Sequence, residues 1–398
     1  MELKLKKSSF DYGKDKLMLE DKFILFLYSF YFILKPFYFW SSGLPQISDF
    51  IMILLVAIFV LAKKGYSLKL SNKGILIFSS LFIFYTIGIN LFWSIILSST
   101  DMILPSVYLF YNYLVLFVVS LMVQLYQDKI IEITFKSCLI SLSIQIIIYM
   151  ISGGSSGVRN VGTFNNPNQL GYYALLITAL IMFCANQVNT RVRWTVLGIS
   201  SGLILAFTSL SKAAILSYLG LVFVFILKNL LNKKNIKKMI IVLVMLISSY
   251  SLINSTTNIL NENQVLQSVE TRLNSIGDDS DDNLEGRGYG RIIDFPEYWV
   301  FGAGEGEFNR FSGPLQGYEF HSTLGNIQVS YGLIGLILYI LLLLSVTKGN
   351  GYSNFYIIIF ILIYGITHNG IRNSLFWILV ALIASRTDNR QNVDKTNM

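Results

Sequence analysis

Residues 321–346 read HSTLGNIQVSYGLIGLILYILLLLSV, a stretch that passes from a polar start into an unbroken apolar run. A run of about 20 apolar residues is long enough to cross a bilayer as a helix. The stretch begins at His321, which closes a long polar segment, residues 254–320. We therefore expect a titratable imidazole where a membrane helix meets water, a position better suited to chemistry than to packing.

The apolar character continues along the whole chain. Hydrophobic residues make up 54% of the 398 residues, charged residues only 14%, and the mean hydropathy is +0.58, whereas soluble domains have about 25% charged residues. Apolar runs of about 18 residues recur, which predicts an all-α polytopic membrane protein. We expect about twelve transmembrane helices, with eleven or thirteen also compatible, near residues 23–40, 47–62, 74–97, 106–126, 136–152, 169–187, 194–208, 212–230, 239–253, 322–346, 353–367 and 371–385.

Basic residues are distributed unevenly between the segments that join these spans. If the N-terminus is cytoplasmic and the spans alternate, 23 of the 31 Lys and Arg residues fall on the cytoplasmic side, as the positive-inside rule requires. The net charge of +8 is then a topology signal and does not indicate nucleic acid. The predicted organisation is a cytoplasmic N-terminal segment (1–22), a transmembrane domain (23–386) with one large extracytoplasmic loop (254–320), and a cytoplasmic tail (387–398).

The basic residues on the extracytoplasmic side are mostly arginines, and both histidines, His321 and His368, are expected there. Arginine offers a permanently charged planar fork that matches phosphate oxygens, whereas lysine is a point charge. We therefore predict that the outer face is functional and that its ligand is anionic. The alternative is that outer loops tolerate a few arginines. The basic residues of this face are Arg159, Lys212, Arg272, Arg287, Arg291, Arg310 and Arg372.

Residues 153–168, GGSSGVRNVGTFNNPN, form a short outer segment rich in turn-forming residues. If Asn168 caps the next helix, a helix N-terminus lies beside Arg159 and forms an anion site; an ordinary turn is the alternative. Lys212 opens an apolar helix, where its ammonium either snorkels to the interface or meets an anion. Lys35, in the outer third of the first span, is expected to snorkel.

The large loop contains three further patterns. The acidic run 278–282 lacks the glycine and glutamate spacing of an EF-hand, so we interpret it as a solvated charge run. Arg287 and Arg291, four residues apart, would share one face of a helix, although three neighbouring glycines weaken the helical prediction. The run GAGEG at 302–306 resembles a phosphate-binding loop but lacks the expected lysine and flanking elements, so a flexible turn is the better interpretation.

Glu319 and His321 are the candidate catalytic pair. At the start of a helix, the helix dipole disfavours the protonated imidazole, so a neutral His321 could act as a general base. Glu319 could orient His321 or act as the base itself. The alternative is a polar helix cap at the membrane interface. Cys138 and Cys184 fall within expected spans, so we predict no disulfide and no cysteine-based metal site.

The order His-Ser, nine residues, Gly, two residues, Gly at residues 321–335 resembles a signature of bacterial O-antigen ligases and related Wzy-type polysaccharide polymerases. Residues 159–168 resemble the family's loop before a mid-chain span, and residues 287–308 resemble the segment that leads to its histidine motif. Lys212 stands where the family commonly has arginine and departs from the pattern. The resemblance covers roughly residues 150–345.

The resemblance implies a membrane-embedded C-type glycosyltransferase-like architecture, without metal or cofactor. Its substrates would be glycans on undecaprenyl diphosphate at the outer face of the cytoplasmic membrane. In that reaction His321 would be the first choice of base and Glu319 the second. The residues that would bind the diphosphate are Arg159, Arg287, Arg291, Lys212 and Arg372.

The expected function is a polysaccharide polymerase that joins lipid-linked repeat units into capsule, O-antigen or exopolysaccharide. Its partners would be lipid-linked donor and acceptor oligosaccharides, membrane lipid, a chain-length regulator and a flippase. One alternative is an O-antigen-type ligase that transfers the glycan to a terminal acceptor. The other, from a different class, is a lipid-glycan flippase, which would carry charge deep within its spans.

Overall fold

The computed structural model describes residues 17–41, 45–64, 72–152, 159–188, 190–230, 287–311, 317–347 and 353–385, with two further single residues at 271 and 274. All regular structure in these ranges is helical. The expected span 239–253, the acidic run 278–282 and the tail 387–398 lie outside the described residues.

Six helices in the described ranges are long and apolar enough to cross a membrane, which is typical of a helical membrane protein. They are α3 (Lys73–Leu97), α4 (Ile103–Tyr126), α5 (Asp128–Ile151), α6 (Pro167–Gln187), α8 (Lys212–Leu230) and α12 (Thr323–Ser345).

The other described spans of the prediction form shorter helices. They are α1 (Leu19–Leu34), α2 (Ile47–Ala62), α7 (Val192–Thr208), α13 (Phe355–Gly365) and α14 (Ser374–Ser385). Three short elements lie within the predicted large loop, namely α11 (Gly290–Asp294), η3 (Pro296–Tyr298) and η4 (Phe308–Arg310).

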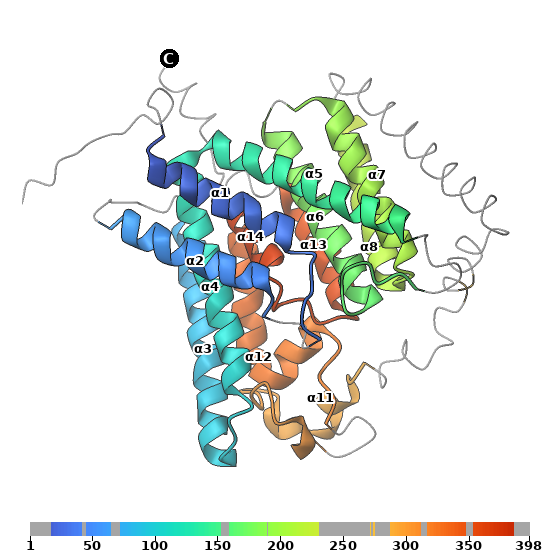
Figure 1. The fold of residues 1–398 in the computed structure, drawn as a ribbon. Coiled ribbons are helices and arrows are strands. Elements are labelled where there is room, and N and C mark those ends of the chain that lie inside the picture. Colours follow the sequence, from blue (N-terminus) through green and yellow to red (C-terminus); the bar gives the residue numbers. More distant parts are fainter. Residues whose placement is uncertain are drawn as a thin grey trace, which may run out of the picture.

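Helices α6 and α14 form the centre of the bundle (Figure 1). Every residue of α14 and all residues from Leu170 to Cys184 of α6 are buried. A helix that is apolar on all sides is stable only when neighbouring helices surround it. These two helices can therefore position the loops at their ends against the rest of the protein.

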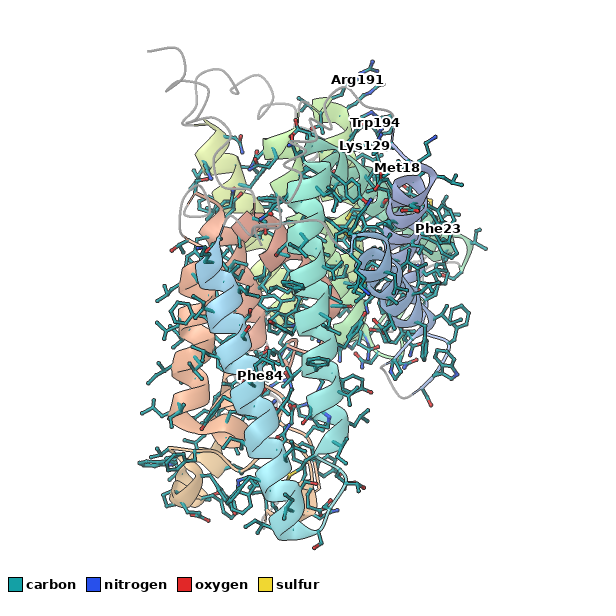
Figure 2. The ribbon with its side chains drawn as sticks, turned by 90° about the vertical axis from the view of Figure 1, so that its left-hand side faces the viewer. Met18, Phe23, Phe84, Lys129, Arg191 and Trp194 are labelled. Carbon is teal, nitrogen blue, oxygen red and sulfur yellow. The ribbon has the colours of Figure 1, made fainter. Side chains whose placement is uncertain are left out.

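Helix α3, in contrast, exposes much of its apolar surface. Ile77, Phe84 and Ile95 of α3 are 53%, 60% and 79% exposed. Figure 2 shows apolar side chains projecting outward along this helix, with Phe84 labelled. Water disfavours so large an apolar face, whereas lipid accepts it.

Helices α1 and α2 form an antiparallel pair that runs across α3 and α4 in the view of Figure 1. An ion pair joins them at each end: Lys35 to Asp49 at 2.8 Å and Lys63 to Asp21 at 2.6 Å. All four side chains are buried. The expectation that Lys35 snorkels is therefore wrong, because its ammonium meets a carboxylate of α2 instead.

Helix α12 breaks at Gly332, where φ is +64° and ψ is −170°. The backbone groups released by the break bind the glycine-rich run of the loop: the N–H of Leu333 donates to the Trp299 carbonyl at 2.7 Å, and the N–H of Gly304 donates to the Ser330 carbonyl at 2.7 Å. A Cβ on Gly332 would lie 2.3 Å from the Val300 carbonyl oxygen. The interpretation of residues 302–306 as a flexible turn is thus wrong, because this segment is buried and hydrogen-bonded to α12. The backbone groups that the break in α12 leaves without helical partners bond to protein instead of facing lipid.

Candidate functional site

His321 lies just before α12 and is exposed. The N-cap of this helix is Ser322, whose Oγ accepts from the N–H of Gly325 at 3.1 Å. The expectation that the helix starts at His321 is therefore two residues early, because helical backbone begins at Thr323. His321 precedes the cap.

The second histidine, His368, lies in the connection between α13 and α14. Burial is the largest cause that lowers its pKa from 6.5 to about 3, followed by electrostatic interactions with Arg287, His321 and Arg159. These four residues come from four separate segments of the chain, so the fold gathers them at one place. We refer to Arg159, Arg287, His321 and His368 as the basic cluster.

Arg287 is anchored to the backbone beside His368. Its Nη1 donates to the Thr367 carbonyl at 2.8 Å. Arg287 precedes α11, which begins at Gly290, so Arg287 and Arg291 do not share a helix face as the four-residue spacing suggested. Arg287 faces the α13–α14 connection instead.

Arg159 connects two of the outer segments that the sequence singled out. Its Nη2 donates to Asn168 Oδ1 at 2.7 Å and its Nε to the Ser209 carbonyl at 3.3 Å. The cap of α6 is Asn166, whose Oδ1 accepts from the N–H of Gln169 at 2.9 Å. The prediction that Asn168 caps this helix is therefore wrong, and Asn168 instead orients the guanidinium of Arg159. Lys212 begins α8, directly after the turn that contains Ser209.

An aromatic stack supports His368. Its ring lies 4.8 Å from that of Tyr364, which lies 4.4 Å from that of Tyr172, with both pairs nearly parallel. The Tyr364 hydroxyl donates to the Asn168 carbonyl at 3.1 Å. The stack thereby links α6, α13 and the Arg159 loop. The sequence did not indicate the stack, because Tyr172 lies nearly 200 residues from Tyr364 and His368.

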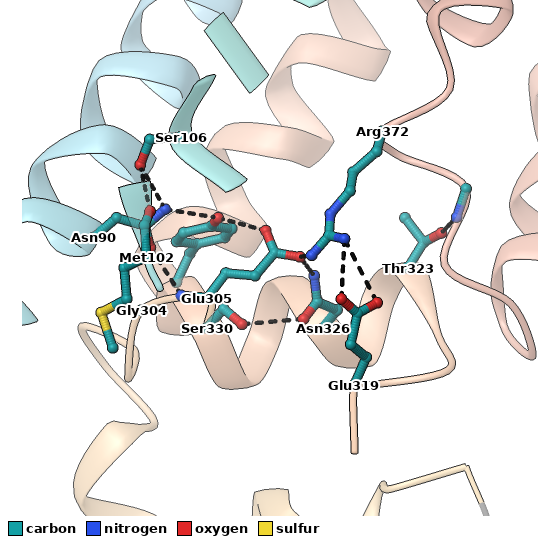
Figure 3. Close-up of polar contacts among 12 residues, drawn as sticks. Asn90, Met102, Ser106, Gly304, Glu305, Glu319, Thr323, Asn326, Ser330 and Arg372 are labelled. Carbon is teal, nitrogen blue, oxygen red and sulfur yellow. Dashed lines mark hydrogen bonds and ion pairs between the residues drawn. The ribbon is translucent and has the colours of Figure 1, made fainter. Parts of the chain in front are cut away.

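Arg372 forms a separate group with two carboxylates (Figure 3). Its Nη2 lies 2.8 Å from Glu305 Oε1, and its Nη1 lies 3.2 Å from Glu319 Oε1. Burial alone would lower the pKa of Arg372, but the two carboxylates outweigh burial and raise it. The sequence did not indicate Glu305 as a site residue, because it lies within the glycine-rich run 302–306.

Arg291 contacts other residues of the large loop. Its Nη2 donates to the Tyr318 carbonyl at 2.9 Å, and its guanidinium lies 5.1 Å from the ring centre of Phe311. Burial lowers its pKa. Of the five expected diphosphate ligands, the structure thus brings Arg159 and Arg287 to the histidines.

This arrangement can bind an anion and transfer a proton. The basic cluster offers permanent positive charge and two imidazoles, and Glu319 offers a half-exposed carboxylate. Among the described residues, no group of three or more His, Cys, Asp or Glu side chains could hold a metal ion. Neither a protein-family model nor a curated protein sequence matches this chain.

Proposed function

We propose that the chain is a glycosyltransferase that uses glycans carried on undecaprenyl diphosphate at the outer face of the cytoplasmic membrane. Within that class we propose a polymerase of capsule, O-antigen or exopolysaccharide repeat units. The observation that supports it best is the geometry of the basic cluster: Arg287 donates to the Thr367 carbonyl next to His368, at 2.8 Å. Arg159 contacts Asn168, whose carbonyl accepts from the Tyr364 hydroxyl, and the Tyr364 ring stacks on His368. A diphosphate leaving group needs such positive charge where its own charge develops.

The reaction would be a displacement at the anomeric carbon of the donor glycan. Arg159 and Arg287 would bind the diphosphate, with Lys212 close to the turn that Arg159 contacts. The acceptor hydroxyl would lose its proton to a base, for which the sequence motif favours His321 first and Glu319 second. Positioned charge and a base are the two contributions such a transfer requires from the protein.

The placement of Lys129 and Arg191 is compatible with the proposed topology, in which both termini are cytoplasmic. Lys129, Arg191 and Met18 lie at one end of the molecule in Figure 2, and α11 lies at the opposite end in Figure 1. Under the proposal the first end is cytoplasmic and basic. The second end carries the loop segment that leads to Glu319 and His321.

A flippase is a less suitable proposal. Such a protein would carry charge along a passage through its spans. The buried charges of α1 and α2 lie at the ends of these helices, and Lys35 and Lys63 are each neutralised by an aspartate. They cross-link two helices rather than line a passage.

Reconstitution tests the function directly. The purified full-length protein in liposomes is given lipid-linked oligosaccharide extracted from cells that lack its gene. The polymerase proposal predicts a ladder of products, each longer by one repeat unit. A single transfer that requires a different, terminal acceptor would show a ligase, and movement of intact substrate across the bilayer without new bonds would show a flippase.

A further inference from the structure

Arg372 holds its two carboxylates unequally. Glu305 is 1% exposed and lies 2.8 Å from Arg372 Nη2, whereas Glu319 is 54% exposed, with its two oxygens 3.2 and 3.5 Å from Nη1. The first carboxylate is buried and the second remains accessible to water and to a substrate. The two carboxylates can therefore have different roles.

Glu305 is fixed from all sides. Its carboxylate accepts from Asn326 Nδ2 and from the Tyr331 hydroxyl, both at 2.8 Å, and its own N–H donates to Asn90 Oδ1 at 2.8 Å (Figure 3). The backbone next to Glu305 packs closely against the Asp101 backbone: a Cβ on Gly306 would lie only 2.8 Å from the Asp101 carbonyl oxygen. Glu305 is therefore a permanent counter-ion for Arg372.

The formal charge of this group disfavours a diphosphate. Glu305 already neutralises Arg372, so the three side chains together carry one net negative charge, located on the exposed Glu319. A phosphate that approached Arg372 would meet this carboxylate and be repelled. Arg372, which the sequence grouped with the diphosphate ligands, therefore belongs to a different part of the site from Arg159 and Arg287.

The backbone that carries Glu319 is also held in place. Phe320, between Glu319 and His321, is 2% exposed, and its ring centre lies 5.6 Å from that of Tyr289. A Cβ on Gly325 would lie 2.2 Å from the Phe320 ring, so the first turn of α12 fits closely against it. The buried Phe320 side chain thus fixes the short segment that contains both candidate bases, Glu319 and His321.

We propose that Glu319 accepts the proton of the acceptor hydroxyl, and that Arg372 and Glu305 position it; this assignment rests on the proposed function. The hydroxyl proton passes to the Glu319 carboxylate as the hydroxyl oxygen bonds to the anomeric carbon of the donor. The bond from that carbon to the phosphate oxygen breaks, and its electron pair leaves with the lipid diphosphate. His321, which interacts electrostatically with His368 next to the Arg287 anchor at Thr367, then serves the diphosphate side.

Two measurements on the same variants test this assignment. The first is the elongation rate in liposomes with extracted lipid-linked oligosaccharide, and the second is equilibrium binding of undecaprenyl diphosphate. Glu319→Gln should slow elongation by about 100-fold or more, the usual contribution of a general base, and should leave undecaprenyl diphosphate binding within about twofold. Added formate should restore part of the rate to Glu319→Ala, because a small carboxylate can replace the missing one.

Arg372→Met and Glu305→Gln should also lower the rate without weakening undecaprenyl diphosphate binding, whereas Arg287→Met should weaken it. A purely structural role for Arg372 or Glu305 would reduce both quantities together. The matched control is Glu307→Gln, a carboxylate of the same loop that accepts a hydrogen bond from Ser99 Oγ at 2.9 Å. Its rate should equal that of the wild type.

The outcomes separate this inference from the proposed function. If the wild type elongates the substrate and Glu319→Gln does so at a similar rate, the assignment of Glu319 is wrong and the function stands. If Arg372→Met loses undecaprenyl diphosphate binding as Arg287→Met does, Arg372 is a diphosphate ligand and the positioning role is wrong. If the wild type does not elongate the substrate, the proposed function fails and the assignment fails with it.

Discussion

Lys35 and Asp49 form a buried ion pair in which Nζ lies 2.8 Å from Oδ1. Lys35 is the C-cap of α1, and Asp49 lies in the first turn of α2. The same oxygen of Asp49 accepts from the Tyr111 hydroxyl of α4 at 3.2 Å. Ser374 Oγ of α14 donates to it as well, at 3.4 Å. One carboxylate thereby connects four helices, and Lys35 compensates its charge.

Removal of one partner of this pair should destabilise the protein strongly. Lys35→Met leaves Asp49 buried without its cation, which should cost about 3–5 kcal/mol. The double variant Lys35→Met/Asp49→Leu should recover part of the loss, because no buried charge remains. Thermal unfolding in detergent measures both. Lys136→Met is the control, since its partner Glu132 is 54% exposed and such pairs contribute at most about 1 kcal/mol. Equal shifts for Lys35→Met and Lys136→Met would contradict the interpretation.

Gly332→Ala should lower stability by about 2 kcal/mol or more. The positive φ alone costs a side chain about 1–2 kcal/mol, and the new Cβ would lie 2.3 Å from the Val300 carbonyl oxygen. Gly88→Ala in α3 is the matched control, because no atom lies within 4 Å of its added Cβ. This control should be neutral or stabilise the helix by up to about 1 kcal/mol. Limited proteolysis should cut the 287–311 segment faster in Gly332→Ala only; unchanged cleavage would refute the bracing role.

Lysine should not replace the arginines of the basic cluster. Arg159 donates through two different nitrogens, Nη2 and Nε, to Asn168 and Ser209, and a lysine cannot reproduce that planar fork. Arg159→Lys and Arg287→Lys should therefore impair elongation nearly as much as the corresponding alanine variants. Arg193→Lys, in the first turn of α7, where the guanidinium lies 5.2 Å from the Trp194 ring centre, should remain fully active. Full activity in both cluster variants would indicate nonspecific electrostatics.

Stability should depend on pH through His368. Burial and the charges of Arg287, His321 and Arg159 lower its pKa to about 3, and the nearby Tyr364 ring adds no charge. The unfolded chain therefore binds a proton below about pH 6.5 that the folded protein does not bind. Stability should fall as the pH drops from about 6.5 towards 3, by at most about 1.4 kcal/mol per pH unit, and should show no such change above that range.

His368→Gln should remove this part of the pH dependence. The comparison is the difference in unfolding temperature between pH 7.5 and pH 4.5, measured for the wild type and the variant in the same detergent. The variant should show the smaller difference. An identical difference in the two proteins would mean that His368 already titrates normally in the folded state.

Cysteine labelling in whole cells should establish the topology. Cys138 and Cys184 are buried, so the background should be low. A cysteine at position 280 should react with a membrane-impermeant reagent in intact cells, whereas one at position 191 should react only after lysis. The reverse pattern would overturn the proposed orientation and the outer location of the site.

The sequence by itself determined where the helices run. The expected span 47–62 coincides with α2 and the expected span 212–230 with α8, because both signals, an apolar run and its polar ends, are local. The first span, expected at 23–40, was placed too far along the chain: α1 begins at Leu19 and ends at Leu34, before Pro36, which cannot donate to a helix. His321 and Glu319 were proposed as site residues from sequence, through their position before a long apolar run, and their roles remain predictions.

Only the tertiary structure decided which charged groups face one another. Lys35 meets Asp49 only when α1 packs against α2, and Glu305 meets Arg372 only because the loop folds back over the break in α12. His368 joins Arg159 and Arg287 for the same reason, through contacts of Thr367, Tyr364 and Asn168 between segments far apart in the chain. Hydropathy and periodicity describe each helix on its own. The choice of a buried partner depends on a balance of desolvation and pairing that exists only after the helices have packed.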